Sequence, residues 1–513
     1  MGKVVEMKGI KKIFPGVIAN DDVNFDLEEG EIHVLLGENG AGKTTLMNIL
    51  YGLYQQEAGD IFVHGQKAMI KNPKEAIKLG IGMVHQHFML VHNFSVAQNM
   101  ILGQEPKKGM NLDIGKAIKD TEELSKKYGF NIDAKAIIED MTVGQQQKVE
   151  ILKALYRGAD ILILDEPTAV LTPQEIDELG VILRNLVKEG KSIILITHKL
   201  KEVMKMSDRV TIIRRGKVID IVKTKETNID ELAEMMVGRK VNLKVEKKPT
   251  ELGKAMLTIE NLQVLDHRKL PAVKGVSLEV KAGEILAIAG VDGNGQTELV
   301  EAIAGLRKPI GGKIELNGHD ITGRTPREAI ESGLGHIPED RHKRGLVLKY
   351  SLAENAILGY HYKAPFAKGI MMNYGEVKEY AKKLIKSYDV RTPNEEVAAS
   401  ALSGGNQQKM IIAREIEKNP ELIIAAQPTR GLDVGAIEYI HRRLVEERDN
   451  NRAVLLVSLE LDEVLSLADR IAVIYDGQIV DVLDAKDATE QKLGILMAGG
   501  KLKKETQGGN TNE

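Results

Sequence analysis

The sequence predicts an α/β protein made of two tandem domains, each with a mostly parallel β-sheet at its core. Three observations point to this fold class. At 513 residues the chain is longer than one ordinary domain. A long stretch of it recurs in diverged form. Short apolar runs alternate with segments whose apolar residues recur at helical spacing, which is typical of a parallel sheet covered by helices.

Two pairs of segments define the repeat. GEIHVLLGENGAGKTTLMNILYGL, from Gly30, recurs as GEILAIAGVDGNGQTELVEAIAGL, from Gly283, so positions 30 and 283 differ by an offset of 253. GQQQKVEILKALYRGADILILDEPT, from Gly144, recurs as GNQQKMIIAREIEKNPELIIAAQPT, from Gly405, so the offset between 144 and 405 is 261. A repeat of about 250 residues is a duplicated domain rather than a solenoid unit.

The repeat sets the expected domain boundaries. We expect a first domain over residues 1–242 and a second over 256–500. The segment 243–255 is polar, rich in Lys and Glu and contains one Pro, which is typical of a linker. The polar tail 501–513 is predicted to be disordered.

Composition excludes several classes of function. The net charge of -3 gives no bulk attraction for nucleic acid or anionic lipid, so we expect no nucleic-acid partner. The lack of cysteine excludes disulfides and thiolate zinc sites. The apolar runs have strand length, far below the roughly 20 residues that span a bilayer. Any work at a membrane therefore requires docking onto another protein.

The first repeat contains a phosphate-binding loop. Residues 37–44, GENGAGKT, fit the pattern G-x-x-x-x-G-K-[ST] between a strand candidate, Ile32–Leu36, and an amphipathic helix. Glycines let backbone N–H groups point at phosphate oxygens, and the helix start adds its positive end. Lys43 is expected to bridge the β- and γ-phosphates, and the Thr44 hydroxyl to bind Mg²⁺. The predicted ATP-binding residues here are Gly37, Glu38, Asn39, Gly40, Ala41, Gly42, Lys43, Thr44 and Thr45.

Other strand ends carry candidate catalytic residues. Asp165 ends the apolar run ILIL and can hold Mg²⁺, while Glu166 follows it and is the candidate general base for the attacking water. His198 ends another run, where it can contact the γ-phosphate. Gln86 is a candidate to coordinate Mg²⁺ or position water. Phe14 is a candidate to stack on adenine, or a core residue.

Together these motifs resemble, in order and spacing, those of ABC ATPase domains. The second repeat also carries LSGGNQQK, from Leu402, which is close to the LSGGQ signature of that family. The resemblance covers nearly the whole chain. It implies two P-loop domains, each with an antiparallel β subdomain and a helical signature subdomain. It also implies head-to-tail pairing, in which the signature of one domain closes over the ATP of the other. The signature residues expected to contact ATP are Ser403, Gly404, Gly405 and Asn406.

The second repeat has lost most of this chemistry. The two offsets place neutral residues at four catalytic positions, so its hydrolysis is expected to be negligible. The first repeat's own signature, with Thr142 and Gly144, is weaker and is expected to face this degenerate site. The loop glycines Gly290, Gly293 and Gly295 remain and allow weak nucleotide binding. The replacements are Lys43 by Gln296, Asp165 by Ala426, Glu166 by Gln427, His198 by Leu459 and Gln86 by Glu339, with Thr44 kept as Thr297.

The resemblance extends to one class of machine. FPGVIANDDVNF, LSGGNQQK and QPTRGLD resemble sugar-type importers with two fused cassettes, and MVHQHFMLVHNFSVAQNMILG resembles their nucleoside branch. This implies a motor, peripheral at the cytoplasmic face of the membrane, that uses ATP and Mg²⁺. It also implies two permease subunits and, indirectly, an extracytoplasmic binding protein. The alternatives are a ribose- or galactose-type importer and, in another class, a soluble ABC-F-type translation factor.

The resemblance also locates a docking region. Residues 86–105 and 339–360 are where such motors meet their permeases. The first of these segments is unusually apolar, and its side chains are candidates for either a docking groove or the core. They are Phe88, Met89, Leu90, Val91 and Phe94.

Overall fold

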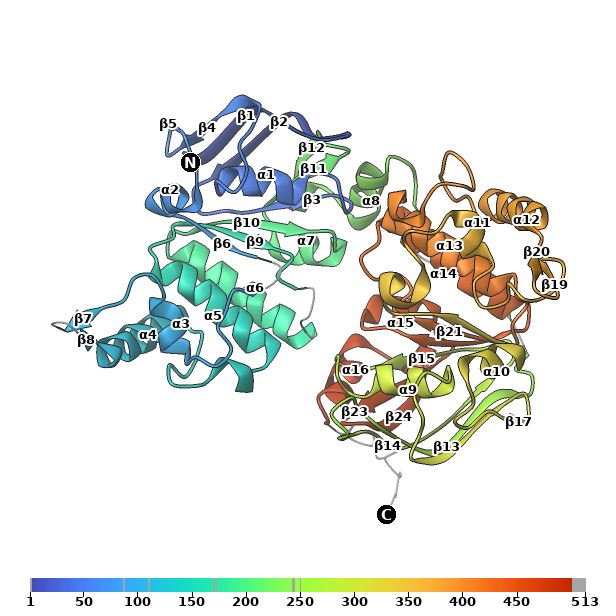
Figure 1. Ribbon diagram of the computed structural model, residues 1–513. Coiled ribbons are helices and arrows are strands. Elements are labelled where there is room, and N and C mark those ends of the chain that lie inside the picture. Colours follow the sequence, from blue (N-terminus) through green and yellow to red (C-terminus); the bar gives the residue numbers. More distant parts are fainter. Residues whose placement is uncertain are drawn as a thin grey trace, which may run out of the picture. The chain divides into compact units, whose positions relative to one another are not determined.

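The computed structural model describes residues 2–85, 88–108, 111–168, 171, 173–241, 245–249 and 251–500. The chain divides into two compact units, Met1–Val241 and Asn242–Glu513, which are described separately (Figure 1). The tail 501–513 and residues 242–244 and 250 lie outside the described residues. Of the segment predicted to be a linker, Lys247 is held by the second unit, where its ammonium donates to the carbonyl oxygen of Ala468 at 2.6 Å.

The first unit contains two sheets. The central six-stranded sheet is parallel except at one edge, where β12 runs antiparallel to β11. Its inner strands are buried along their whole length, as expected for strands covered on both faces. The antiparallel sheet has the order β2(Val17–Glu28), β1(Lys3–Phe14), β4(Ala58–Val63) and β5(Gln66–Ala68). The central order is β12(Lys217–Lys223), β11(Arg209–Arg214), β3(Ile32–Leu36), β10(Ser192–Thr197), β9(Ile161–Asp165) and β6(Ile81–Val84).

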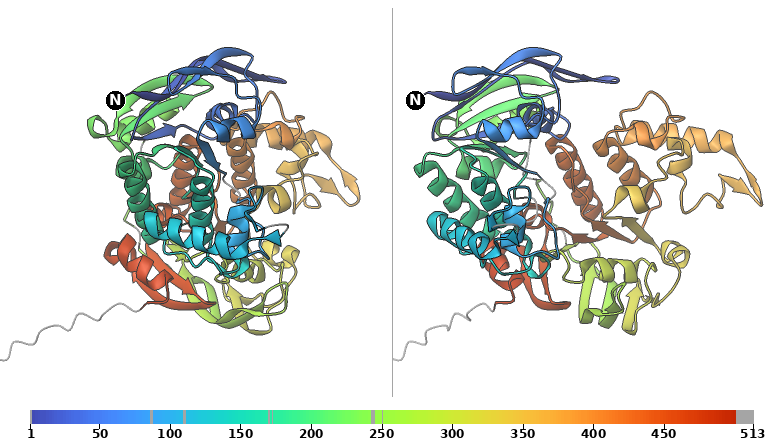
Figure 2. Two further views of the ribbon diagram at one scale, coloured as in Figure 1. Left: turned by 90° about the vertical axis from the view of Figure 1, so that its left-hand side faces the viewer. Right: turned by 60° about the vertical axis from the view of Figure 1, so that its left-hand side comes forward.

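The helices of the first unit connect these strands. In Figures 1 and 2, α3, α4 and α5 lie on the side of the central sheet away from the antiparallel sheet. Together they form the helical subdomain. The helices are α1(Lys43–Leu50), α2(Pro73–Lys78), α3(Val96–Ile101), α4(Ile114–Tyr128), α5(Val143–Tyr156), α6(Pro173–Lys188), α7(Leu200–Met206) and α8(Ile229–Val237), and a hairpin of β7(Lys107–Lys108) and β8(Asn111–Leu112) precedes α4.

The second unit repeats this plan strand for strand. Its sheets have the orders β14-β13-β16-β17 and β18-β21-β22-β15-β23-β24. The strands are β13(Ala255–Leu265), β14(Pro271–Lys281), β15(Ile285–Ala289), β16(Gly311–Leu316), β17(His319–Asp320), β18(Leu334–Ile337), β19(Ala367–Lys368), β20(Met371–Met372), β21(Leu422–Ala426), β22(Ala453–Val457), β23(Arg470–Tyr475) and β24(Gln478–Asp484). The helices are α9(Gln296–Ile303), α10(Pro326–Glu331), α11(Leu352–Ala356), α12(Tyr374–Ser387), α13(Gly404–Ile416), α14(Val434–Asp449), α15(Leu461–Leu467) and α16(Glu490–Met497).

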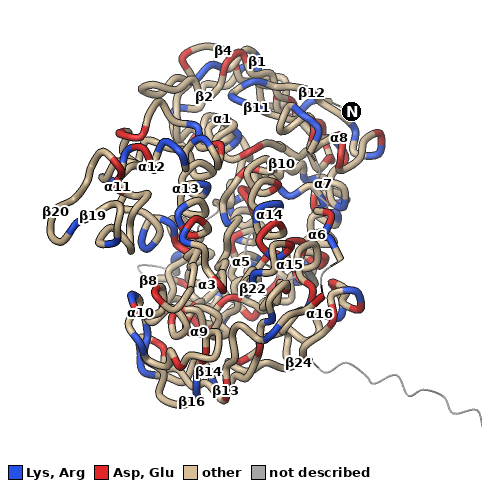
Figure 3. Tube along the Cα trace, turned by 90° about the vertical axis from the view of Figure 1, so that its right-hand side faces the viewer, with Lys and Arg blue, Asp and Glu red and all other residues tan. Residues whose placement is uncertain are grey.

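The predicted fold class of two α/β domains is thus confirmed. Basic and acidic residues are interspersed along the chain in Figure 3, in keeping with the small net charge. Among the described residues, every helix is too short or too polar to cross a membrane.

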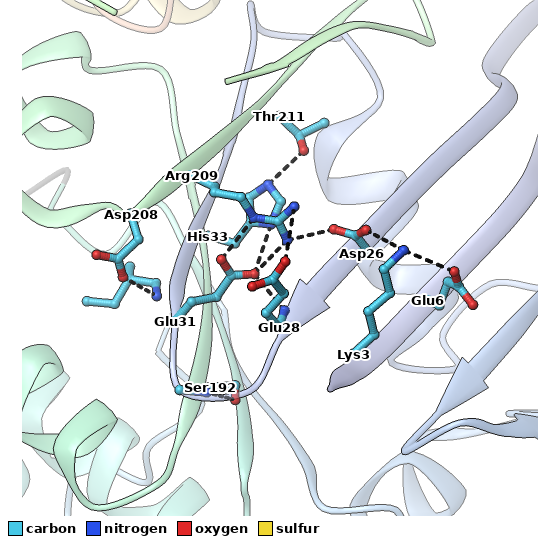
Figure 4. Close-up of polar contacts among 12 residues, drawn as sticks. Lys3, Glu6, Asp26, Glu28, Glu31, His33, Ser192, Asp208, Arg209 and Thr211 are labelled. Atoms are coloured by element: carbon cyan, nitrogen blue, oxygen red, sulfur yellow. Dashed lines mark hydrogen bonds and ion pairs between the residues drawn. The ribbon is translucent and has the colours of Figure 1, made fainter. Parts of the chain in front are cut away.

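A network of charged side chains ties the two sheets of the first unit together (Figure 4). Arg209, on β11, donates to Glu31 at 2.7 Å and to Asp26, on β2, at 2.6 Å. Burial acts to raise the pKa of Glu31, but contacts with His33 and Arg209 outweigh it and lower the pKa from 4.5 to about 2. The second unit repeats the central contact between Arg470 and Glu284.

We expect the Glu31 contacts to make the stability of the first unit depend on pH. Because the folded-state pKa is lowered, their contribution is complete above about pH 4.5 and is lost as the pH falls toward 2. Glu31→Gln should therefore lower the free energy of unfolding by about 2–3 kcal/mol at pH 7 and much less at pH 3. Urea unfolding at both pH values measures this. Glu28→Gln is the control, because that carboxylate is 4.0 Å from Arg209 and 38% exposed; an equal loss in both variants would contradict the prediction.

Candidate functional site

The loop between β3 and α1 has the conformation that a phosphate cradle needs. Gly42 has φ 103° and precedes α1, and a Cβ there would lie 2.2 Å from the carbonyl oxygen of Ala19. A Cβ at Gly37 would lie 2.3 Å from the carbonyl oxygen of Ile213. Only glycine fits at either position. The loop is thus held close to neighbouring backbone, with the N-terminal N–H groups of α1 at its end.

Lys43 and Thr44 begin α1 at this loop. Lys43 is buried, and its ammonium donates to the carbonyl oxygens of Gly37 at 2.7 Å and Glu38 at 3.0 Å. Burial lowers its pKa, and the carboxylates of Glu166 and Asp165 act against this. The ammonium therefore lies inside the loop, where phosphate oxygens can replace the carbonyls.

The end of β9 brings two carboxylates to the loop. The Thr44 hydroxyl donates to Asp165 at 3.4 Å. Burial, together with the charge of Glu166, raises the pKa of Asp165 to about 6. A hydroxyl and a buried carboxylate side by side supply the hard oxygen donors that Mg²⁺ prefers. Thr44 and Asp165 are therefore suited to hold this cation.

Glu166 and His198 form a direct pair at the ends of β9 and β10. His198 Nδ1 lies 2.8 Å from Glu166 Oε1. Burial acts to raise the pKa of Glu166, but the hydrogen bond with His198 and nearby positive charges lower it overall, so the carboxylate is ionised at neutral pH. Glu166 has φ 47°, in the left-handed region, and its N–H donates to the carbonyl oxygen of Ile196. The residue after β9 thus brings its carboxylate to His198, at the end of the neighbouring strand β10.

The remaining predicted residues are Gln86, Phe14 and the apolar segment that follows residue 86. Gln86 lies outside the described residues. Phe14 ends β1, where its ring packs edge-on against Tyr54 with 5.4 Å between centroids. In the apolar segment that follows residue 86, Leu90 is buried, Met89 and Val91 are exposed, and Phe88 and Phe94 are half-buried.

The second unit keeps the geometry of this site and lacks its charges. Gly295, with φ 98°, precedes α9, and Gln296 donates to the carbonyl oxygen of Val291 at 3.0 Å, folded back as Lys43 is. Gln427 follows β21 with φ 47°, the value found at Glu166. Its Oε1 accepts from the N–H of Leu459 at 3.3 Å, where the first unit has a histidine pair.

The two signature segments are capped differently, which sequence reasoning missed. Thr142 caps α5 in a capping box, in which its hydroxyl accepts from the N–H of Gln145 at 3.3 Å and Gln145 accepts from the N–H of Thr142. Ser403 precedes α13 without a side-chain cap, and its hydroxyl accepts from Asn406 Nδ2 at 3.0 Å. The start of α13 thus offers its N–H groups to an anion, whereas at α5 a side chain occupies that position. The pattern T-x-x-Q at Thr142 was the available signal.

Comparisons with known proteins agree with these motifs. The family model described as ABC transporter matches residues 20–169 and 273–430. The chain is 57% identical to the guanosine import ATP-binding protein NupO of Bacillus subtilis (strain 168), over 97% of this chain and 98% of that protein. It is 55% identical to the nucleoside import ATP-binding protein NupA of Lactococcus lactis, covering 97% and 99%. A ribose import ATP-binding protein of Clostridium tetani is 40% identical, covering 95% and 96%. A solved RNase-L inhibitor, 18% identical, shares the two-cassette fold with a TM-score of 0.60 over 93% of this chain and 90% of that one.

Proposed function

Because the chain belongs to the ABC transporter family, we propose that it is the ATP-hydrolysing motor of a nucleoside importer, with one catalytic site assembled from both cassettes. The assignment of nucleosides as the substrate class rests on one observation. Over nearly the full length, the two relatives named for guanosine or nucleoside import are 57% and 55% identical, whereas the ribose relative is 40% identical. The likeness to the RNase-L inhibitor concerns the fold alone.

The first cassette supplies the groups that act on ATP. The loop 37–45 binds the phosphates through its N–H groups, and Lys43 turns from the loop carbonyls to the β- and γ-phosphates. Thr44, Asp165 and Gln86 hold Mg²⁺, which neutralises phosphate charge when bound. Glu166, ionised and oriented by His198, accepts a proton from the attacking water. Phe14 stacks on the adenine.

The second cassette completes this site with its signature. The uncapped start of α13 is the support for this assignment, because Ser403, Gly404 and Gly405 leave backbone donors for the γ-phosphate. At α5 of the first cassette, by contrast, the Thr142 side chain already caps the helix start, which makes this signature the weaker phosphate binder. Hydrolysis then requires both halves of the chain, although one half holds all the catalytic side chains.

Transport requires partners that span the membrane. We infer two permease subunits, a binding protein that acts indirectly, and a peripheral position at the cytoplasmic face. A cavity of about 190 Å³ in the first unit is a suitable docking site, lined by residues of α2, β6 and α5. At its rim, the backbone N–H of Met89 donates to Glu150 and its carbonyl accepts from Lys153 at 2.8 Å. The backbone is thus anchored while the Met89 side chain is 64% exposed.

Met89→Asp is expected to uncouple ATP hydrolysis from transport. A carboxylate at this exposed apolar position weakens docking but leaves the anchoring backbone contacts and the fold in place. Transport by the reconstituted complex should fall at least tenfold, while the ATPase activity of the isolated chain changes less than twofold. Met69→Asp is the control, because Met69 is 75% exposed elsewhere in the same unit. Undiminished transport by a folded Met89 variant would remove the support for docking here.

The substrate is tested with the complete complex. We expect guanosine and other nucleosides to raise ATPase activity when the chain is purified from membranes with its permease and binding protein. Stimulation by ribose or galactose alone would favour the sugar importer. Recovery of the chain with ribosomes and without a permease would favour a translation factor.

A further inference from the structure

The hydroxyl that ends each phosphate loop has a different partner in the two units. In the first, Thr44 donates to Asp165, at the end of β9, at 3.4 Å. In the second, Ala426 replaces that aspartate, and Thr297 donates instead to Glu339 Oε2, just beyond β18, at 3.2 Å. The second unit has therefore replaced one carboxylate by another that comes from a different strand.

The replacement carboxylate is already paired with a cation. Glu339 Oε1 accepts from Arg430 Nη1 at 2.7 Å, so a guanidinium lies one carboxylate away from the Thr297 hydroxyl. The Arg430 backbone is fixed on both sides, because its N–H donates to Gln427 and its carbonyl accepts from Arg341 at 3.1 Å. The arginine side chain is 59% exposed and its partner 31%, so the pair contributes little to stability. The Glu339–Arg430 pair is of interest because it lies at the phosphate loop, where Glu339 also contacts Thr297.

The two phosphate loops differ in the charged side chains that surround them. Around the first, the Lys43 ammonium faces the carboxylates of Glu166, Asp165 and Glu38, so positive charge is in deficit beside bound phosphates and a divalent cation makes up for it. Around the second, the positions of Lys43, Asp165 and Glu166 are neutral, Glu339 is paired with Arg430, and the loop and the first turn of α9 also carry Asp292 and Glu298. A divalent cation at the Thr297 hydroxyl would have to displace a guanidinium from Glu339, the carboxylate that accepts from this hydroxyl. The second loop therefore does not fit Mg²⁺, which dehydrates reluctantly and favours carboxylate oxygens.

The second loop keeps the means to bind phosphate. Gly293 and Gly295 have positive φ, and α9 starts without a side-chain cap, so its N–H groups face the loop. A guanidinium binds phosphate oxygens with paired, charge-assisted hydrogen bonds. Phosphate oxygens can thus replace Glu339 as the partner of Arg430 without moving its backbone.

We propose that the second phosphate loop binds a nucleoside triphosphate without a divalent cation, with the Arg430 guanidinium in the place that a metal takes in the first loop. This rests on the proposed function, in which the first loop is the hydrolytic one. The nucleotide stays intact because Gln427, at the position of Glu166, cannot accept a proton from water. The second loop is then a holding site rather than a catalytic one.

The test isolates the second loop in the full chain. Lys43→Ala removes the phosphate-binding ammonium of the first loop, and radiolabelled ATP is then measured by equilibrium dialysis in EDTA and in MgCl₂. We expect about one ATP per chain, with a Kd that differs less than threefold between the two conditions. Adding Arg430→Gln should weaken binding in EDTA by about tenfold or more, and Arg430→Lys by less.

Another exposed arginine of the second unit provides the control. Arg324→Gln removes an arginine of the same unit that is 57% exposed and paired with Glu328, and it should leave the Kd unchanged. The proposal fails if EDTA abolishes binding, if no ATP binds at millimolar concentration, or if Arg430→Gln has no more effect than the control. ATPase activity of the unmodified chain is measured separately, so a negative binding result does not contradict the proposed hydrolysis at the first loop. Circular dichroism checks that each variant is folded.

Discussion

Glu166→Gln is expected to lower ATP turnover by about a thousandfold, within the range that general-base catalysis contributes. The amide keeps the size of the side chain and the left-handed backbone but cannot accept a proton from the attacking water. It also loses the carboxylate that His198 contacts at 2.8 Å. Steady-state phosphate release measures the loss. ATP binding, measured by dialysis, should change little, since Lys43 and the loop remain.

The second unit provides the control for this variant. Gln427→Glu places a carboxylate at the repeat-equivalent position, which has the same φ of 47°. It should not raise turnover in the unmodified chain, and it should not restore turnover in the Glu166→Gln variant. The reason is that Ala426, Gln296 and Leu459 stand where the first unit has an aspartate, a lysine and a histidine. Substantial turnover by Glu166→Gln would show that another group activates the water, and the one-site proposal would be wrong.

Gly404→Asp is expected to reduce turnover at least a hundredfold, although it lies in the cassette without catalytic side chains. A carboxylate at the uncapped start of α13 occupies the position proposed for the γ-phosphate and repels it. A Cβ at Gly404 would lie 2.9 Å from Arg341 Nη2, so the change requires only that the end of this side chain shift and needs no movement of the backbone. Phosphate release is again the measurement.

Val143→Asp is the matched control, since Val143 is the repeat-equivalent first residue of α5. The side chain is 44% exposed and the helix is already capped by Thr142. We expect turnover to stay within about twofold of the unmodified chain. Equal losses from both changes would mean that the two signatures serve equally active sites, contrary to the assignment of one catalytic site.

Much of the architecture followed from local patterns in the sequence. The apolar runs Ile32–Leu36, Ile161–Leu164 and Ile193–Ile196 are buried strands of one sheet. They were predictable because a strand covered on both faces has to be apolar throughout. The loop 37–44 was predictable because close backbone contacts leave no room for side chains at Gly37 and Gly42.

Other features depended on contacts that local patterns do not encode. The pair of Glu339 and Arg430 joins residues far apart in the chain, and it forms only because two neighbouring strands end at the same sheet edge. The capping box at Thr142 was visible as T-x-x-Q, but its meaning emerged only beside the uncapped Ser403. The buried pairing of Glu31 with Arg209 likewise depends on which strands are neighbours.

The left-handed residue after β21 records the ancestry of the second cassette. Gln427 keeps a backbone conformation that costs about 1–3 kcal/mol for a residue other than glycine, although it no longer carries a carboxylate to orient. The main-chain conformation has therefore been kept although the carboxylate that it positioned has been replaced. Where a repeat assigns such a residue to the position of the general base, as it does for Gln427, the backbone conformation marks a former hydrolytic domain after its carboxylate has been replaced.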